Sequence, residues 1–527
     1  MTTPDQAEPH AVTFIDVPSR LRELLTLSGN HPLLQYSGRW TTVSDVANTA
    51  AEIDHLLTLA GVGAGAMVAL LTRNRSSHVS AIIGVLSSGR CLVPVTSIQS
   101  DDSTVADLDR SGASVLVADD EDWSRAGLAS GCRELGILGL RLASGHVERV
   151  EGTELCRSIT TMPGVAVMMP TSGTTGLPKR IPYTYEQLGG ALGRVAAYSP
   201  ANQRALAGPL KFRPGAVVAT LTMAHVAGFW TVLQALNEGR PLALLDRFEP
   251  RAWASLVEEH AVAAAMIPPA TLTMILDAGI EPAQLKSLKA VLCGTAPLDP
   301  GVGERFTERY DVPVLTAYGA TEFPGGTVGW TLGDYHRYHA AKFRSAGRAR
   351  PGIKIKVVDP ETHAELAPES EGLIAVLSPQ ATSRTEDGWV ITNDLGRIDA
   401  DGFLYVHGRA DDAINRGGFK IVPQVVEEAL RAHPAVAEAA VVGLPDSRLG
   451  EIPVAAVEIR NTVTEDELLA WLRARMAKYQ IPVAIRAVDA LPRTASLKVS
   501  KPGVRALMSA LPILSLDASR APDQPGS

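Results

Sequence analysis

The sequence predicts an α/β protein, with a large N-terminal region of mixed sheets flanked by helices and a small α+β domain after it. Apolar strand-like runs alternate with helical patterns through most of the chain, as is typical of α/β layers with a largely parallel sheet. The last hundred or so residues instead combine two strands with capped helices. A chain of 527 residues also exceeds what one ordinary core supports.

The alternation is clearest in two stretches. The first contains the strand-like runs 67–74, 91–96 and 114–120, with a helical pattern over 76–89. The second begins at residue 241 and reads PLALLD, RAWASLVEEHA, AAAMIPPA, TLTMILDAG and AVLCGT. Continuous apolar runs of this length are expected for strands that helices cover on both faces.

The C-terminal part is predicted to be a separate unit. Pro423 lies near the start of one helix, and Thr464 and Glu467 have the spacing of a capping box at the start of another. EAAVVGLP and IPVAAVEI are strand-like. We therefore expect an N-terminal domain over 1–408, a hinge at 409–412, a mobile C-terminal domain over 413–510 and a disordered tail over 511–527.

Composition excludes several classes of protein. The net charge of −8 argues against a protein that binds nucleic acid backbones. The four cysteines show no metal-ligand spacing, and the N-terminus lacks a signal sequence, which favours the cytoplasm. The uncharged segment from Pro214 to Asn237 is long enough for a bilayer, but polar residues interrupt it, so a buried strand followed by a buried helix is expected.

A loop suited to phosphate follows the strand-like run VAVMM. Its glycines let the backbone approach an anion, its hydroxyl and NH groups donate hydrogen bonds, and Lys179 adds a charge. It is not a P-loop, because Arg180 follows the lysine where Ser or Thr is required. The loop residues we assign to phosphate are Thr171, Ser172, Gly173, Thr174, Thr175, Gly176 and Lys179.

Seven ordered motifs between about Tyr36 and Leu507 resemble those of the adenylate-forming superfamily, which includes acyl-CoA synthetases, luciferases and peptide-synthetase adenylation domains. They are TSGTTGLPK (171–179), MAHVAGFW (223–230), CGTAPL (293–298), AYGATE (317–322), GWVITNDLG (388–396), GRADDAINRGGFKIVPQVVE (408–427) and LPRTASLK (491–498). The resemblance implies that the chain activates a carboxylic acid with ATP and Mg²⁺ to give acyl-AMP, and then transfers the acyl group to coenzyme A.

The resemblance also assigns site residues. Glu322 is expected to hold Mg²⁺, as suits a carboxylate. Lys498 is expected to neutralise the charge that develops when the acid attacks phosphorus. The other assignments are Gly294, Thr295, Ala296 and Tyr318 beside adenine, Thr321 on the α-phosphate, Asp394 and Arg409 on the ribose hydroxyls, Asp411 at the hinge, and Gly417 and Gly418 beside the pantetheine arm.

The sequence departs from the family pattern at two places. Leu497 stands where glycine usually precedes the lysine, so the placement of Lys498 is in question and Lys501 is a weaker alternative. Asn393 stands in a Thr-Asn-Asp segment where glycine is common. Since Asn tolerates the left-handed backbone conformation, we expect the turn there to be kept.

His225 occupies the position of the family residue beside the substrate carboxylate. No Asp lies between Thr220 and Thr231 to pair with an α-ammonium group, so an α-amino acid is disfavoured and a fatty or aromatic acid is expected. Five apolar residues fit an acyl pocket and a core equally well. They are Ala227, Phe229, Trp230, Ala320 and Phe323.

Three functions stay open at this point: a coenzyme A ligase, an acyl-AMP ligase that loads a separate carrier protein, and a nucleotide-binding homologue with impaired catalysis. The last is motivated by Leu497 and Asn393. The resemblance also implies a homodimer as one state of assembly.

Overall fold

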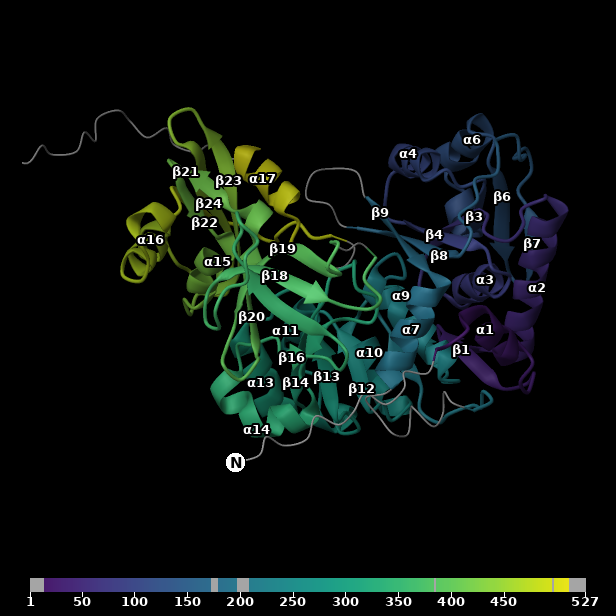
Figure 1. Cartoon of the computed structure of the whole chain (residues 1–527), viewed down its shortest axis with the longest axis horizontal. Coiled ribbons are helices and arrows are strands. Elements are labelled where there is room, and N and C mark those ends of the chain that lie inside the picture. The colour runs from purple at the N-terminus through teal and green to yellow at the C-terminus, as the bar shows by residue number, and fades with distance from the viewer. Residues whose placement is uncertain (1–13, 172–178, 197–207, 383–384, 495–496, 511–527) are drawn as a thin grey trace, which may run out of the picture. The chain divides into compact units, whose positions relative to one another are not determined.

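The computed structural model describes residues 14–171, 179–196, 208–382, 385–494 and 497–510 (Figure 1). The chain forms two compact units. The large unit comprises Met1–Thr392, Gly396–Val406 and Ala495–Lys498, and the small unit comprises Asn393–Leu395, His407–Thr494 and Val499–Ser527.

The first layer of the large unit is a seven-stranded sheet in the order β7-β6-β5-β3-β4-β8-β9, parallel except at its two edge strands. Helices α2 and α3 cover one face and α4 to α6 the other, so the central strands are buried, as their continuous apolar sequence predicts. The elements are α2 (Val43–Leu59), β3 (Met67–Thr72), α3 (Ser76–Ser87), β4 (Cys91–Thr96), α4 (Asp101–Ser111), β5 (Val115–Asp119), α5 (Asp120–Trp123), α6 (Ala126–Glu134), β6 (Leu138–Ala143), β7 (His146–Arg149), β8 (Val165–Pro170) and β9 (Arg180–Thr184).

Three further sheets lie wholly or mostly in the large unit, in the orders β10-β11-β1-β2, β12-β13-β14-β15-β16 and β17-β18-β19-β20. Asn393–Leu395 of β19 and residues 407–409 of β20 group with the small unit. The alternation predicted from residue 241 onward is confirmed as β11, α10, β12, α11 and β13. The strands are β1 (Pro32–Tyr36), β2 (Arg39–Thr42), β10 (Val217–Ala219), β11 (Leu242–Leu244), β12 (Ala264–Ile267), β13 (Ala290–Cys293), β14 (Val314–Tyr318), β15 (Val328–Gly329), β16 (Arg348–Ala349), β17 (Lys354–Val358), β18 (Gly372–Leu377), β19 (Trp389–Ile398) and β20 (Leu404–Arg409). The helices are α1 (Val17–Leu25), α7 (Tyr185–Ala196), α9 (Val226–Asn237), α10 (Pro250–Glu259), α11 (Pro269–Asp277), α12 (Pro282–Leu285), α13 (Pro300–Tyr310) and α14 (Leu332–Lys342).

The small unit is an α+β body around the strand order β22-β21-β24-β23, with β25 paired to β24. The capping box of Thr464 and Glu467 is present at the start of α16, and Leu468 and Leu472 of that helix lie in the core. The elements are η1 (Ala410–Asp412), β21 (Ile414–Arg416), β22 (Phe419–Ile421), α15 (Pro423–Arg431), β23 (Val436–Asp446), β24 (Gly450–Ile459), α16 (Glu465–Arg473), η2 (Lys478–Gln480), β25 (Ala484–Ala487) and α17 (Lys501–Ala510).

The uncharged segment from Pro214 to Asn237 folds as the sequence predicts, into the short strand β10 followed by the largely buried helix α9. Within the described parts of the chain, no helix has the length and apolar character needed to cross a membrane.

The prediction of a turn at Asn393 is wrong. Asn393 lies inside the continuous strand β19 and is absent from the residues with positive φ. An extended backbone is open to any side chain, so Asn in place of Gly requires no special conformation there.

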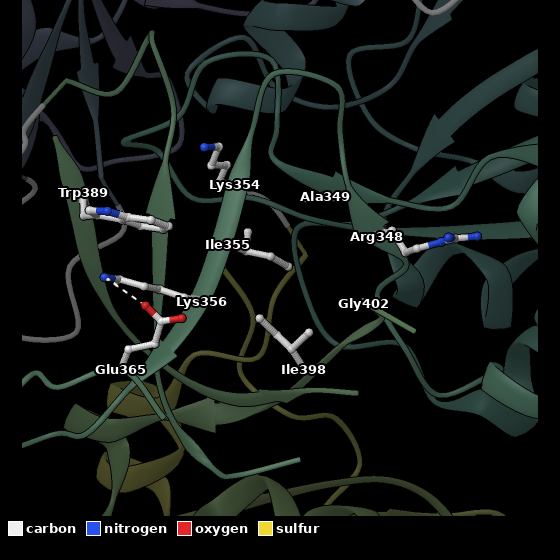
Figure 2. A pocket seen from close by; sticks show the side chains of 9 residues that line it. All are labelled: Arg348, Ala349, Lys354, Ile355, Lys356, Glu365, Trp389, Ile398 and Gly402. Atoms are coloured by element: carbon white, nitrogen blue, oxygen red, sulfur yellow. Dashed lines mark ion pairs between the residues drawn. The ribbon is translucent and has the colours of Figure 1, made fainter. Parts of the chain in front are cut away.

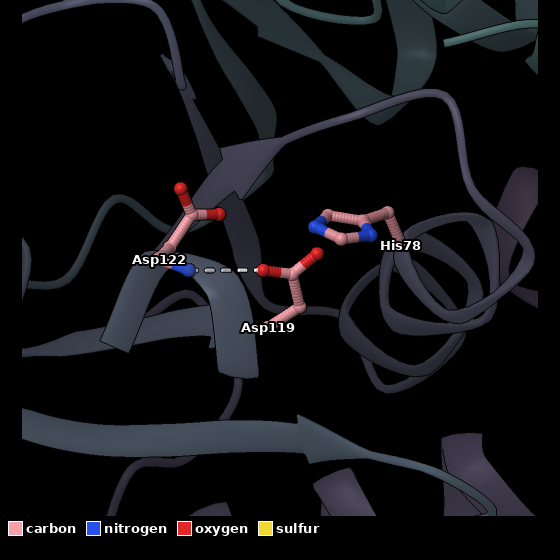
Figure 3. Close-up of side chains that lie close together, drawn as sticks. All are labelled: His78, Asp119 and Asp122. Atoms are coloured by element: carbon pink, nitrogen blue, oxygen red, sulfur yellow. Dashed lines mark hydrogen bonds between the residues drawn. The ribbon is translucent and has the colours of Figure 1, made fainter. Parts of the chain in front are cut away.

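A buried ion-pair network lies where β3 and β5 end. Figure 3 shows three neighbouring side chains of this cluster, His78, Asp119 and Asp122. The chain leaves these neighbouring strands in opposite directions, which is where doubly wound sheets commonly bind ligands. Here Arg73 donates to both carboxylate oxygens of Asp122, at 3.0 and 2.8 Å, and Arg75 donates to Asp119 at 2.6 Å. His78 lies within 4.8 Å of both carboxylates. Because guanidinium groups already bind these carboxylates, we interpret the cluster as structural rather than as a metal site.

This network predicts a pH dependence of stability. Burial lowers the pKa of His78 from 6.5 to about 4, with Arg75 acting in the same direction and Asp119 against it. The unfolded chain therefore takes up a proton between these values while the folded chain does not, and stability falls as the pH drops through that window. In His78→Gln, the slope of unfolding free energy against pH should decrease by up to about 1.4 kcal/mol per pH unit.

The measurement is denaturant unfolding between pH 4 and 7, with the exposed His55→Gln as the matched control. Equal slopes in the wild type and His78→Gln would contradict a neutral buried imidazole.

Candidate active site

The base of the predicted phosphate loop is closed by backbone pairing. Thr171 N donates to Lys179 O at 2.8 Å, and Pro170 pairs with Arg180 across β8 and β9. Thr171 and Lys179 thus hold the two ends together, whereas Ser172, Gly173, Thr174, Thr175 and Gly176 lie outside the described residues.

Arg180 anchors this loop base in the sheet. Its guanidinium donates to Asp107 at 2.7 Å and to the carbonyls of Pro94 and Met168 at 2.9 and 3.1 Å. The side chains of both partners are almost fully buried, at 8% and 5% exposure. Lys179 is exposed, so one of the two adjacent cations is structural and the other faces solvent.

Tyr183 links the strand that returns from the loop to the segment carrying Glu322. Its hydroxyl donates a short hydrogen bond to the carbonyl oxygen of Thr321. Burial, and next the negative charge of Glu322, raise the pKa of Tyr183. The loop base and the predicted metal ligand are therefore neighbours. The sequence analysis missed Tyr183. The one sequence feature that points to it is its place in the strand directly after the loop.

His225 is the N-cap of α9. Its Nδ1 accepts a hydrogen bond from Ala227 N at 3.2 Å, which fixes the proton on Nε2 in the neutral ring. Burial lowers the pKa of His225 to about 4, and the positive charge of Lys498 adds to this. The ring is therefore a neutral Nε2–H donor near neutral pH, and Lys498 is close enough to act on it.

The predicted adenine segment has an unusual backbone. A side chain at Gly294 would place Cβ 3.3 Å from the carbonyl oxygen of Ala317, a tight contact that glycine avoids where this segment approaches β14. Thr295 follows with φ of +72°, which is strained for a β-branched residue. Its Oγ1 is buried and finds no hydrogen-bond partner among the described residues. Ala296, the next residue along the chain, is half-buried, and so is Tyr318 at the end of β14.

The predicted ribose and hinge residues belong to the small unit. Arg409 Nε and Nη2 donate to the two carboxylate oxygens of Asp411, both at 2.7 Å. This hydrogen bonding, together with the charges of Asp411 and Asp394, raises the pKa of Arg409. The charge of Asp394 therefore acts on Arg409, and their shared contact with ribose stays a prediction.

Gly417 and Gly418 form the two-residue turn between β21 and β22, with φ of +57° and +89°. Two consecutive left-handed residues are the requirement of a tight hairpin turn, which glycine meets without strain. This turn accounts for both glycines without a ligand, and their expected contact with pantetheine stays a prediction.

Leu497 has φ of +62°, the conformation that glycine adopts without cost. Although leucine replaces the usual glycine, the residue before Lys498 still has a left-handed backbone conformation. Lys501 is tied elsewhere, since its ammonium binds Glu427 and donates to Val441 O at 2.9 Å. Lys501, the weaker alternative, is thus held by groups of the small unit, and the role of Lys498 stays a prediction.

Phe229 and Phe323 are each 1% exposed and belong to hydrophobic cores. Trp230 also lies in the core, but its ring reaches Gly325, where an added Cβ would stand 3.3 Å from it. Of the five residues that fit both an acyl pocket and a core, Trp230 has the most direct link between α9 and the segment after Glu322. Ala227 and Ala320 are half-buried.

A shallow groove of about 560 Å³ lies apart from these residues (Figure 2). It is lined by Arg348, Ala349, Lys354, Ile355, Lys356, Glu365, Trp389, Ile398 and Gly402. Lys356 lies over the ring of Trp389 at 4.4 Å and pairs with Glu365 at 3.7 Å. Since no residue predicted for catalysis lines it, we do not assign it to the active site.

Two family models match the chain. The AMP-binding enzyme model matches residues 22–384, and the AMP-binding enzyme C-terminal domain model matches residues 425–498. Feruloyl-CoA synthase from an Amycolatopsis species is 30% identical, over 91% of this chain and 96% of that protein. The fatty acid–[acyl-carrier-protein] ligase ScoC from Streptomyces coeruleorubidus is 27% identical, over 90% of this chain and 93% of that protein.

Among solved structures, o-succinylbenzoate CoA synthetase (MenE) from Bacillus subtilis matches with a TM-score of 0.74 and 25% identity, over 93% of this chain and 98% of that one. That enzyme was solved with its acyl-adenylate intermediate, and also with ATP and a magnesium ion.

The backbone at Leu497 gives a test of its conformation. Replacement by Gly removes the left-handed penalty, while replacement by Ala removes the side chain and keeps the penalty. The free energy of unfolding of Leu497→Gly, measured with denaturant, should therefore be about 1 kcal/mol higher than that of Leu497→Ala. If the Leu497→Ala variant were instead more stable than the Leu497→Gly variant, φ at position 497 would be negative in solution.

Proposed function

The chain belongs to the AMP-binding enzyme family, and from this we propose that it is an AMP-forming acid–thiol ligase. It activates an organic carboxylic acid with ATP to give acyl-AMP and pyrophosphate, and then forms a thioester with coenzyme A. ATP, Mg²⁺ and coenzyme A are the implied cofactor and co-substrates.

The observation that supports this function best is the hydrogen bond from Tyr183 to Thr321. It places the strand that leaves the phosphate loop against the segment that ends in Glu322. A triphosphate with its metal ion requires the phosphate loop and the metal ligand to lie close together. The chemistry of the donor set fits Mg²⁺, because Glu322 offers hard carboxylate oxygens. A Mg²⁺ ion held there would neutralise phosphate charge.

The first half-reaction needs no general base, since a carboxylic acid is ionised at neutral pH. The barrier is the approach of one anion to another, and we propose that Lys498 lowers it by placing its ammonium where charge develops on the α-phosphate. Thr321 is proposed to donate to the same phosphate. Thr171, Lys179 and the loop between them are proposed to hold the remaining phosphates.

His225 is proposed to orient the acid. A neutral imidazole with its proton on Nε2 donates one hydrogen bond to the carboxylate and adds no charge that would make the carboxylate a poorer nucleophile. It also cannot pair with an α-ammonium as an aspartate does. We therefore propose a fatty or aromatic acid, with Trp230 at the wall of the acyl pocket.

The nucleotide is proposed to bind through Gly294, Thr295, Ala296 and Tyr318 at adenine and through Asp394 and Arg409 at ribose. We propose that residues 1–408 form the adenylation domain, 409–412 the hinge around Asp411, and 413–510 a small domain that moves between the half-reactions. Gly417 and Gly418 then leave room for the pantetheine arm. A cytoplasmic location is also proposed, in keeping with four cysteines that are all free thiols.

A second candidate function is the loading of a carrier protein in trans. The similarity to ScoC favours it, because that ligase is named for an acyl carrier protein. A third, a nucleotide-binding homologue that has lost catalysis, draws its support from Leu497 and Asn393.

The experiment is pyrophosphate release from ATP and Mg²⁺ over a panel of short, medium, long-chain and aromatic acids, with and without coenzyme A. We expect acid-dependent release that accelerates with coenzyme A. Lys498→Ala should lower the adenylation rate about 100-fold or more, while the exposed Lys286→Ala serves as the matched control.

Release that depends on an acid but responds to an acyl-carrier protein rather than coenzyme A would favour the second function. ATP binding without pyrophosphate release for any acid would favour the third.

A further inference from the structure

The chain around Lys498 is closed at its base within the small unit. Ser500 N donates to Pro492 O at 2.7 Å, and Arg493 pairs with Val499 in an antiparallel bridge. These four residues belong to the small unit, as does α17 directly after them. We call residues 494–498 the lysine loop. Lys498 directly precedes Val499, so it stands next to the point where the two ends of this loop meet.

The incoming end of the lysine loop is held by β24. Leu491 N donates to the carboxylate of Glu458 at 2.7 Å, and Arg493 pairs with the same carboxylate at 3.7 Å. Leu491 is 3% exposed and packs in one core cluster with Val504 and Met508 of α17. A backbone hydrogen bond, an ion pair and apolar burial thus fix this end.

The outgoing end is held by Lys501, the first residue of α17. Its ammonium binds the carboxylate of Glu427 on α15 and donates to Val441 O of β23 at 2.9 Å. The same Glu427 oxygen accepts from Val441 N at 2.7 Å, so one carboxylate joins a helix, a strand and the lysine. The side chains of Lys501 and Glu427 are 22% and 11% exposed, which shields the pair from much of the solvent that weakens exposed pairs.

The two ends of the loop are packed directly against each other. A Cβ at Gly503, in the first turn of α17, would stand only 2.7 Å from Cβ of Pro492. Gly503 N also donates to Ser500 Oγ at 3.2 Å. A displacement of the first turn of α17 therefore moves the base of the lysine loop with it.

We propose that Lys501 is a positioning residue for Lys498: by binding Glu427 and Val441 O it fixes the first turn of α17 and, through that turn, the base from which Lys498 extends. This inference rests on the proposed function, since it takes Lys498 as the residue that acts in adenylation. It gives Lys501 a role that needs no contact with substrate or nucleotide.

The proposal specifies which step changes when Lys501 is lost. Lys498 is proposed to act in the first half-reaction, so its displacement slows the formation of acyl-AMP and leaves the transfer of the acyl group to coenzyme A unchanged. Other residues hold ATP, so kcat falls while KM for ATP is kept. A residue that only stabilised the small unit would affect both half-reactions together.

The test is acid-dependent ATP–pyrophosphate exchange and, separately, thioester formation from added acyl-AMP and coenzyme A. Lys501→Met keeps an unbranched side chain and removes the charge, and Lys478→Met is the matched control at an exposed lysine of the same unit. We expect Lys501→Met to lower kcat of exchange about tenfold with KM for ATP unchanged, since a small displacement of a reacting group can cost that much. Lys501→Arg should keep most of the rate because it keeps the ion pair, and Lys478→Met should match the wild type.

Two further variants separate positioning from a loss of stability. Glu427→Gln removes the ion pair from the other side while its amide oxygen can still accept from Val441 N, and it should slow exchange as Lys501→Met does. Adding Lys501→Met to Lys498→Ala should cause no further loss, because the residue that Lys501 positions is then absent.

The outcomes separate this inference from the function on which it rests. Absence of exchange in the wild type for every acid would overturn the proposed function, and full exchange in Lys498→Ala would overturn the role of Lys498. Wild-type kcat in both Lys501→Met and Glu427→Gln, beside a strong effect of Lys498→Ala, would overturn the positioning role alone. Equal losses in both half-reactions that follow a lowered unfolding midpoint would also overturn it.

Discussion

The buried hydrogen bond from Tyr183 to the carbonyl of Thr321 is the contact on which the arrangement of the large unit's site depends. It joins two segments far apart in sequence, one leaving the phosphate loop and one ending in Glu322. A tyrosine hydroxyl with no exposed surface must find a partner, so the pairing fixes the register between these segments as well as their distance. The phosphate donors and the metal ligand proposed in these two segments are thereby held near each other.

Two positions in the predicted site carry left-handed backbone without glycine. Thr295 and Leu497, at φ of +72° and +62°, keep a conformation that costs free energy for their residue types. Such strain persists only where neighbouring structure imposes it. Beside Thr295, Gly294 approaches β14 closely, since an added Cβ would stand 3.3 Å from the carbonyl oxygen of Ala317. At Leu497 the backbone is left-handed although the residue is not glycine.

The sequence alone predicts most of the fold, because buried parallel strands such as β3 and capped helices such as α16 have strong local patterns. It assigns His225 and Lys498 separate roles and does not reveal that the charge of Lys498 acts on His225. It misses Tyr183 and misplaces Asn393 in a turn. Tyr183 is missed because its partner, Thr321, lies far along the chain and no local pattern encodes such a partner. Asn393 is misplaced because its extended backbone belongs to β19, a strand that pairs with β18 and β20.

Two arginine–aspartate pairs, one in each unit, differ in how far they are exposed to solvent. Arg180 and Asp107, at 8% and 5% exposure, are shielded from water, and separating them would leave an unpaired buried charge. That cost suits a loop base that must not shift under a triphosphate. Arg409 and Asp411 make equally short hydrogen bonds in solvent, where water replaces a lost partner cheaply. Contacts of the second kind suit the hinge proposed at 409–412, because they orient a guanidinium and still release it at little cost.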